Sequence, residues 1–223
     1  MHPYVVSLKT LFEQNANPVK AAPMKKYMRD QFEYLGIKTP QNAALQKEFY
    51  KQNGLPQFSD LDEILRGLWS LPQREFQYVG MGLLGKFEKQ LPAEFIDTVE
   101  YLIVTKSWWD TVDLIASHSV GTHFKRFPKV REKYLKKWRK SKNIWLRRTA
   151  ILFQLGYKKE TDFALLTEII CENLNSDEFF INKAIGWALR QYAYTDPIAV
   201  KKFVKATPLH PLSRREAMKH LED

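Results

Sequence analysis

Apolar and polar positions along the chain follow a helical period. Apolar residues recur at spacings of three and four in most segments, alternating apolar stretches are few, and only 9 of the 223 residues are Gly. This periodicity is typical of amphipathic α-helices and not of strands. The sequence therefore predicts an all-α protein.

Proline and capping residues mark the expected helix starts. Pro suits the first turn of a helix, where its missing N–H is not needed, and Asn, Asp, Ser or Thr suits the position before it. Such starts occur at Asn17-Pro18, Thr39-Pro40, Ser59-Asp60, Leu71-Pro72, Leu91-Pro92, Phe127-Pro128, Asp196-Pro197 and Pro211. We expect about a dozen helices of roughly ten to eighteen residues. Short turns should join them into one continuous domain over residues 1–223.

A weak internal repeat has a period of 35 residues. In this register three segments superpose: EFQYVGMGL from Glu75, WLRRTAILF from Trp145 and FINKAIGWAL from Phe180. Short helix pairs at nearly this period are typical of HEAT-type α-solenoids, whose equivalent positions form rows along one surface. One row contains Tyr78, Asp113, Arg148 and Lys183. None of these is a natural core residue, so we expect the row to line a groove.

The positive charge of the chain is concentrated in one segment, Lys125 to Arg148, here called the basic segment. The formal net charge of the whole chain is +10. The basic segment has a single acid, Glu132, against twelve bases: Lys125, Arg126, Lys129, Arg131, Lys133, Lys136, Lys137, Arg139, Lys140, Lys142, Arg147 and Arg148. Clustered cations of one sign are typical of proteins that bind polyanions such as DNA. The alternative is a solvated helix face, but such faces normally mix both signs.

The sequence argues against several other classes of protein and site. No apolar run approaches the ~18 residues of a membrane helix, and the N-terminus lacks the order of a signal peptide, so we expect a cytoplasmic protein without membrane contact. The lone Cys171 has no partner for an internal disulfide, and its apolar neighbours predict a buried thiol. The five His residues lack metal-ligand spacing, and Walker and nucleophile-elbow sequences are absent. GMGLLGK (Gly80 to Lys86) matches a glycine fingerprint but lies in a helical pattern, not after a strand.

Two Trp-bearing stripes are candidates for chemistry. Within KSWWDTVD (Lys106 to Asp113), Trp109 and Asp113 are four apart and share a helix face. Trp187 shares a face with Lys183 and Arg190 in the same way. A carboxylate on a surface that binds phosphate lowers affinity, so its presence suggests a chemical role. The remaining Trp residues are expected to pack in the core or support the site: Trp69, Trp108, Trp138 and Trp145.

Five long segments resemble the AlkD family of bacterial alkylpurine DNA glycosylases. They are PMKKYMRDQFEYLGIKTP (Pro23 to Pro40), LIVTKSWWDTVD (Leu102 to Asp113), NIWLRRTAILFQLGYK (Asn143 to Lys158), FFINKAIGWALRQYA (Phe179 to Ala193) and PLSRREAMKH (Pro211 to His220). The resemblance implies a right-handed α-solenoid of HEAT-like repeats whose concave, basic groove holds duplex DNA. It implies that N3- and N7-alkylated purines are excised without a metal and without a base-flipping pocket, which initiates base excision repair.

The resemblance also assigns roles to residues of this chain. It implies that Asp113, Trp109 and Trp187 are catalytic, that Arg148 and Arg190 are groove cations, and that Tyr27 lies near the DNA backbone. To these we add Lys183, from the same stripe as Trp187, as a DNA-binding residue. No Lys stands out as a Schiff-base nucleophile, so we expect a monofunctional glycosylase, without a cofactor and monomeric.

The chemistry of the substrate fits these residues. An alkylated purine is already cationic and leaves readily, so the enzyme has mainly to stabilise an oxocarbenium-like sugar and admit water. A carboxylate and two indole faces can do this electrostatically. Two alternatives remain at this stage: a non-catalytic HEAT-like protein that binds damaged or branched DNA, and a protein-binding solenoid.

Overall fold

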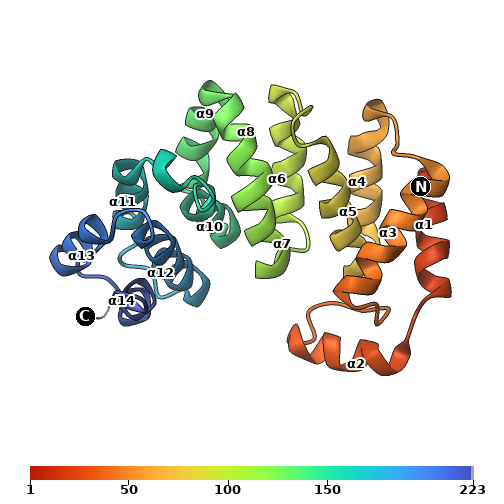
Figure 1. Cartoon of the computed structure of the whole chain (residues 1–223), viewed down its shortest axis with the longest axis horizontal. Coiled ribbons are helices and arrows are strands. Elements are labelled where there is room, and N and C mark those ends of the chain that lie inside the picture. Colours follow the sequence, from red (N-terminus) through yellow and green to blue (C-terminus); the bar gives the residue numbers. More distant parts are fainter. Residues whose placement is uncertain (222–223) are drawn as a thin grey trace. The chain divides into compact units, whose positions relative to one another are not determined.

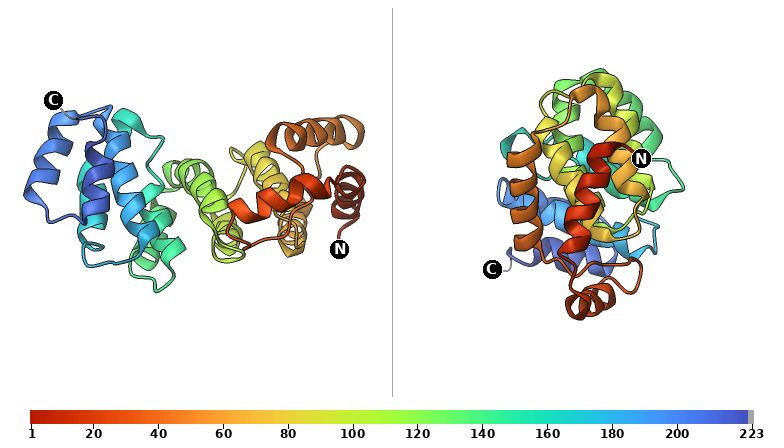
Figure 2. Two further views of the ribbon diagram at one scale, coloured as in Figure 1. Left: turned by 90° about the horizontal axis from the view of Figure 1, so that it is seen from below. Right: turned by 90° about the vertical axis from the view of Figure 1, so that its right-hand side faces the viewer.

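The computed structural model describes residues 1–221, and these fold entirely into helices and the turns between them (Figure 1). The one β-type contact among the described residues is an isolated bridge between Glu33 and Gln73. The chain divides into two compact units, of which the first comprises residues 1–87 and the second begins at residue 88. Coiled ribbons make up both units in the further views as well (Figure 2). The prediction of an all-α protein is confirmed for the described part of the chain.

The first unit contains α1 to α5. Its helices are α1 (Pro3–Gln14), α2 (Pro18–Tyr27), α3 (Thr39–Asn53), the short 3-10 turn η1 (Phe58–Asp60), α4 (Leu61–Ser70) and α5 (Arg74–Phe87). The carboxylate of Glu75 is fully buried and accepts hydrogen bonds from the backbone N–H groups of Leu35, Gly36 and Ile37. This carboxylate therefore fixes the segment between α2 and α3 on the start of α5.

The second unit contains the remaining helices. They are η2 (Ala93–Phe95), α6 (Ile96–Val104), α7 (Trp109–Leu114), the π-helical η3 (Ile115–Val120), α8 (Gly121–Arg126), α9 (Pro128–Trp138), α10 (Ile144–Leu152), η4 (Lys158–Glu160), α11 (Phe163–Cys171), α12 (Phe179–Ala193), α13 (Pro197–Ala206) and α14 (Pro211–Met218). Helix α10 packs against α6, α7, α9, α11 and α12, and α14 packs along α12.

Several helices begin where the sequence predicts. α2, α9, α13 and α14 each begin at the expected Pro, and the side chains of Asn17 and Asp196 accept the expected capping hydrogen bonds from Lys20 and Ala199. Helices α6, α10, α11 and α14 have eight or nine residues, slightly fewer than expected, and the expected lengths are clearly wrong for α7 and α8, which have six residues each. The reason is that η3 continues the backbone of α7 into α8, so that a wider π turn interrupts one helical stretch from Trp109 to Arg126.

Contacts within the second unit confirm the repeat. Side chains meet partners about one period away: Arg148 contacts Asp113 and Lys125 contacts Glu160, both 35 residues apart, and Tyr157 donates to the carbonyl of Gly121 at a separation of 36. Each repeat of a solenoid contacts mainly its neighbours, which explains this narrow range. The unit is thus a stack of helical repeats of the solenoid type. The right-handed curvature, the concave groove and the single domain stay predictions.

Candidate functional site

The centre of the site is an ion pair between α7 and α10. Arg148 donates from Nε to Asp113 Oδ1 (2.7 Å) and from Nη2 to Asp113 Oδ2 (2.8 Å), so both carboxylate oxygens are engaged in parallel. A third donor, Arg148 Nη1, reaches the backbone carbonyl of Phe180 at the start of α12. The side chains are 14% exposed for Asp113 and 3% for Arg148. Asp113 thus keeps a small exposed surface, whereas Arg148 is almost fully buried.

Burial and pairing act in opposite directions on Asp113. Burial, the larger effect, raises the pKa of Asp113 above its usual range because it disfavours the charged form. The hydrogen bonds and the positive charge of Arg148 lower the same pKa. The net effect is a carboxylate that binds a proton more tightly than an exposed one does, and Arg148 opposes this protonation.

Trp109 and Trp187 line two clefts together with this carboxylate. The first, here called the basic cleft, has a volume of about 360 Å³ and is completed by Arg148, Phe179, Phe180, Lys183 and Arg190. The second, here called the acidic cleft, has a volume of about 660 Å³ and includes Glu88, Asp110 and His118. Asp113 lines both clefts. The charged side chains around it are therefore mainly basic in one cleft and mainly acidic in the other.

An aromatic cluster supports the basic cleft. The ring of Trp108 contacts those of Trp145 and Phe180 with centroids 5.8 and 5.1 Å apart, and Trp145 contacts Phe180 at 5.0 Å. The prediction that Trp108 provides packing support is confirmed. Trp69 and Trp138 are fully buried, as predicted, whereas Trp145 is only half-buried, because it belongs to this cluster beside the cleft.

The two predicted cations of α12 share one acid that sequence analysis missed. Glu216 of α14 accepts from Lys183 Nζ at Oε1 (2.7 Å) and from Arg190 Nη1 at Oε2 (2.6 Å). Trp187 lies between these two cations on the same stripe of the helix. Glu216 stands in PLSRREAMKH, but nothing local in that segment connects it with residues 26 and 33 positions earlier.

The predicted row of residues is correct in register and partly wrong in exposure. Asp113, Arg148 and Lys183 all line the basic cleft, as the 35-residue period predicts. Arg148 is nevertheless buried, and its pairing with Asp113 offsets part of the cost of burying its charge. Tyr78 of the first unit shares a hydrogen bond of 3.1 Å with Tyr34. Arg148 therefore lines the cleft, as the row predicts, but it is buried against Asp113, and its direct contact with DNA stays a prediction.

In the folded protein, acidic residues from other segments neutralise part of the positive charge of the basic segment. Acids from other segments pair with four of its members: Glu160 with Lys125, Glu100 with Lys137, both Glu168 and Glu172 with Arg139, and Asp113 with Arg148. A cleft of about 540 Å³ between α9 and α11 contains five of its cations and four acids, and it shares no lining residue with the two clefts of the site. The basic segment thus has more than one environment, and only Arg148 lines the clefts of the site.

Other predicted residues lie elsewhere. Tyr27, the last residue of α2 in the first unit, is 72% exposed. Cys171 is exposed at the end of α11, so the prediction of a buried thiol is wrong; the helix buries Ile169 and Ile170 instead. The glycine-rich string lies inside α5, as expected, and a Cβ at Gly80 would come 2.7 Å from the ring of Trp69, which explains a small residue there without a nucleotide.

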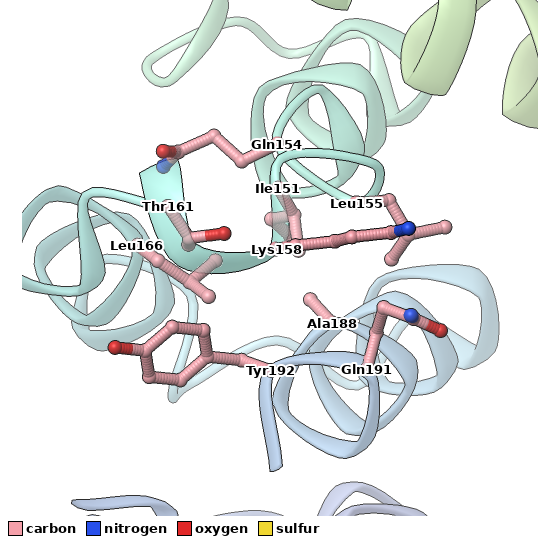
Figure 3. A pocket seen from close by; sticks show the side chains of 9 residues that line it. All are labelled: Ile151, Gln154, Leu155, Lys158, Thr161, Leu166, Ala188, Gln191 and Tyr192. Atoms are coloured by element: carbon pink, nitrogen blue, oxygen red, sulfur yellow. The ribbon is translucent and has the colours of Figure 1, made fainter. Parts of the chain in front are cut away.

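A smaller pocket lies beside the acidic cleft (Figure 3). Ala188, Gln191 and Tyr192 of α12 face Ile151, Gln154 and Lys158 across it, and Leu155 and Gln191 also line the acidic cleft. Its volume of about 10 Å³ is close to the space that a single water molecule needs. This pocket is too small to hold a nucleotide.

Metal-binding groups and membrane helices are both absent from the described part of the chain. No three His, Cys, Asp or Glu side chains of residues 1–221 are grouped so that they could hold a metal ion. No helix among the same residues is long and apolar enough to cross a membrane.

Comparison with known proteins decides the family. The family described as DNA alkylation repair enzyme matches residues 8–221. The chain belongs to this family. Its membership confirms the family resemblance and connects the chain with the repair of alkylated DNA. A solved structure described as a predicted DNA alkylation repair enzyme from Enterococcus faecalis is similar, with 32% identity, a TM-score of 0.86 and coverage of 93% of this chain and 97% of the other. No curated protein matches the sequence significantly.

Proposed function

We propose that this family member is a monofunctional DNA glycosylase. Its substrates would be N3- and N7-alkylated purines in duplex DNA, and its reaction the hydrolysis of the N-glycosidic bond. The observation that carries the proposal is the carboxylate of Asp113, which is held by a buried Arg148 and lines two clefts together with the indole rings of Trp109 and Trp187. A protein that only binds DNA does not need an acid in this position.

The reaction needs little acid catalysis from the protein. When the C1′–N bond breaks, its electron pair leaves with the purine, whose positive charge is thereby neutralised. The deoxyribose becomes an oxocarbenium-like cation, water adds to C1′, and a proton is released. The protein has therefore to stabilise positive charge at the sugar and admit a water molecule.

Asp113 and the two Trp side chains can meet this need. The ionised carboxylate attracts the developing charge, and its burial strengthens that attraction, because less water screens it. The indole faces of Trp109 and Trp187 contribute ~0.5–2 kcal/mol each through their ring quadrupoles. Lys183 and Arg190, which line the basic cleft with Asp113, would attract the phosphates that flank the sugar.

Base release from methylated DNA tests the proposal. Purified protein is incubated with duplex DNA that contains 7-methylguanine, and the freed bases are separated and quantified. We expect free 7-methylguanine and an intact but abasic strand, and Asp113→Asn should slow release strongly without weakening binding. Asp177→Asn, which makes the same change at an exposed position, serves as the control. Tight binding without base release by the unmodified protein would favour the non-catalytic DNA-binding alternative.

A further inference from the structure

Glu216 stands out as a charged group of the site to which no role has been given. Its side chain is 12% exposed, less than that of either cation it binds, and both of its oxygens are engaged. Hydrogen bonds from Lys183 and Arg190 hold the pKa of Glu216 below its usual range, so the carboxylate is ionised at neutral pH. One negative charge thus connects two positive ones that lie two helical turns apart on α12.

The packing of α14 on α12 fixes this carboxylate in place. A Cβ at Gly186 would lie 2.4 Å from the Cβ of Glu216 and 2.9 Å from the carbonyl oxygen of Ser213, so the two helices can be this close only because residue 186 is Gly. Ser213 Oγ also donates to the backbone carbonyl of Asn182 (2.8 Å). The backbone of Glu216 therefore has little freedom to move relative to α12.

By binding both Lys183 and Arg190, Glu216 orders the two cations that precede and follow Trp187 on α12. Lys183 precedes Trp187 by four residues and Arg190 follows it by three, so all three side chains lie on one face. Lys and Arg side chains lose considerable rotamer entropy when they are ordered. Because Glu216 orders both side chains before any ligand arrives, their conformational entropy is lost when the protein folds. Binding of a ligand then causes little further loss.

We propose that Glu216 is a positioning residue, which presents Lys183 and Arg190 as a preformed pair to the phosphodiester groups on either side of the sugar at Asp113. The same carboxylate offsets part of their charge and so limits the affinity for undamaged DNA. This inference rests on the proposed function for its effect on excision. Its effect on DNA binding is independent of any chemistry.

The first test compares Glu216→Gln with the unmodified protein in two assays. Affinity for an undamaged duplex is measured over a series of salt concentrations, and single-turnover release of 7-methylguanine is measured at saturating protein. Loss of the carboxylate frees the full charge of both cations, which should outweigh the added cost of ordering them on binding, so low-salt affinity should increase and the plot of log affinity against log salt should steepen by about one. The excision rate should fall by roughly tenfold, because the pair is no longer held in position. Opposite effects on affinity and rate are not expected from general destabilisation.

Two further variants separate charge from position. Glu63→Gln makes the same change in charge at an exposed position of α4 in the first unit, outside the basic segment and the clefts of the site, and should leave both quantities unchanged. Glu216→Asp keeps the charge but is one methylene shorter, and should retain the original salt dependence with a reduced excision rate. This second variant also tests the inference if Glu216→Gln does not fold.

A background without the two cations shows whether Glu216 acts through them. In a protein with Lys183→Gln and Arg190→Gln, the further change Glu216→Gln should alter neither the salt dependence nor the excision rate. A persistent loss of rate in that background would overturn the inference, and so would a Glu216→Gln protein that equals the unmodified one in both assays. If the unmodified protein releases no base, the proposed function fails, and the salt series still decides whether Glu216 offsets the charge of this pair.

Discussion

Replacing Asp113 by Asn separates the chemistry proposed for this carboxylate from its contribution to folding. Asn has nearly the same size and can still accept one hydrogen bond from Arg148, but it carries no charge. Arg148, whose side chain is 3% exposed, then keeps its positive charge with only neutral partners, the new amide and the carbonyl of Phe180. Both the reaction rate and the stability should therefore fall.

The geometry of the pair sets the size of both effects. Charges about 4 Å apart attract by about 4 kcal/mol at an effective dielectric constant of about 20. Removal of one partner from a buried pair costs about 3–5 kcal/mol, and we expect the lower end because Asn retains one hydrogen bond. A loss of about 3 kcal/mol corresponds to a fall in Tm of about 6–12 °C for a chain of this size. Loss of a charge that stabilises the transition state should slow excision by about 100-fold or more.

A second substitution distinguishes the two effects. Arg148→Met in the Asp113→Asn protein removes the stranded cation and should recover roughly half of the lost stability, because an apolar side chain tolerates this buried position. Stability is measured by urea unfolding followed by circular dichroism, and excision by single-turnover release of 7-methylguanine. We expect the double variant to be more stable than Asp113→Asn and equally inactive.

Two results would refute this reasoning. If the double variant regained the excision rate of the unmodified protein, Asp113 would act only by neutralising Arg148. If Asp113→Asn unfolded at the same urea concentration as the unmodified protein, the pair would contribute nothing to stability. Asp177→Asn controls for the chemical change itself.

Three further predictions concern pH and packing. Because burial raises the pKa of Asp113 and only the ionised form attracts the sugar cation, the single-turnover excision rate should rise with pH to a plateau, with a midpoint above that of an exposed carboxylate. The folded-state pKa of Glu216 is lowered, so its stabilisation is present above its unfolded pKa and lost as pH falls through the folded one. The difference in urea stability between the unmodified protein and Glu216→Gln should accordingly vanish in acid, and a constant difference would contradict this. Gly186→Ala should lower the free energy of unfolding by about 1–3 kcal/mol, measured in urea, because its Cβ would overlap Glu216; Gly85→Ala, where a Cβ meets nothing within 4 Å, is the matched control.

Local chemistry determined much of the fold. The spacing of apolar residues predicted helices throughout, and Pro with its capping neighbours predicted the starts of α2, α9, α13 and α14. These features depend on neighbouring residues alone, which is why they are legible in the sequence. The π turn after Asp113 was not predicted, because it depends on how the stretch packs and not on local propensity.

The 35-residue period and the helical spacing also determined which residues share the site. They placed Asp113, Arg148 and Lys183 in one row and Trp187 on the stripe of Lys183, and all four line the basic cleft. The sequence did not show that Asp113 and Arg148 would neutralise each other, that acids would pair with Lys125, Lys137 and Arg139 of the basic segment, or that Glu216 would join Lys183 to Arg190. Periodicity fixes the face on which a side chain lies, whereas ion pairs depend on which faces meet across repeats. The sequence therefore determined the helices and their order, and only the tertiary structure decided which charges remain available at the site.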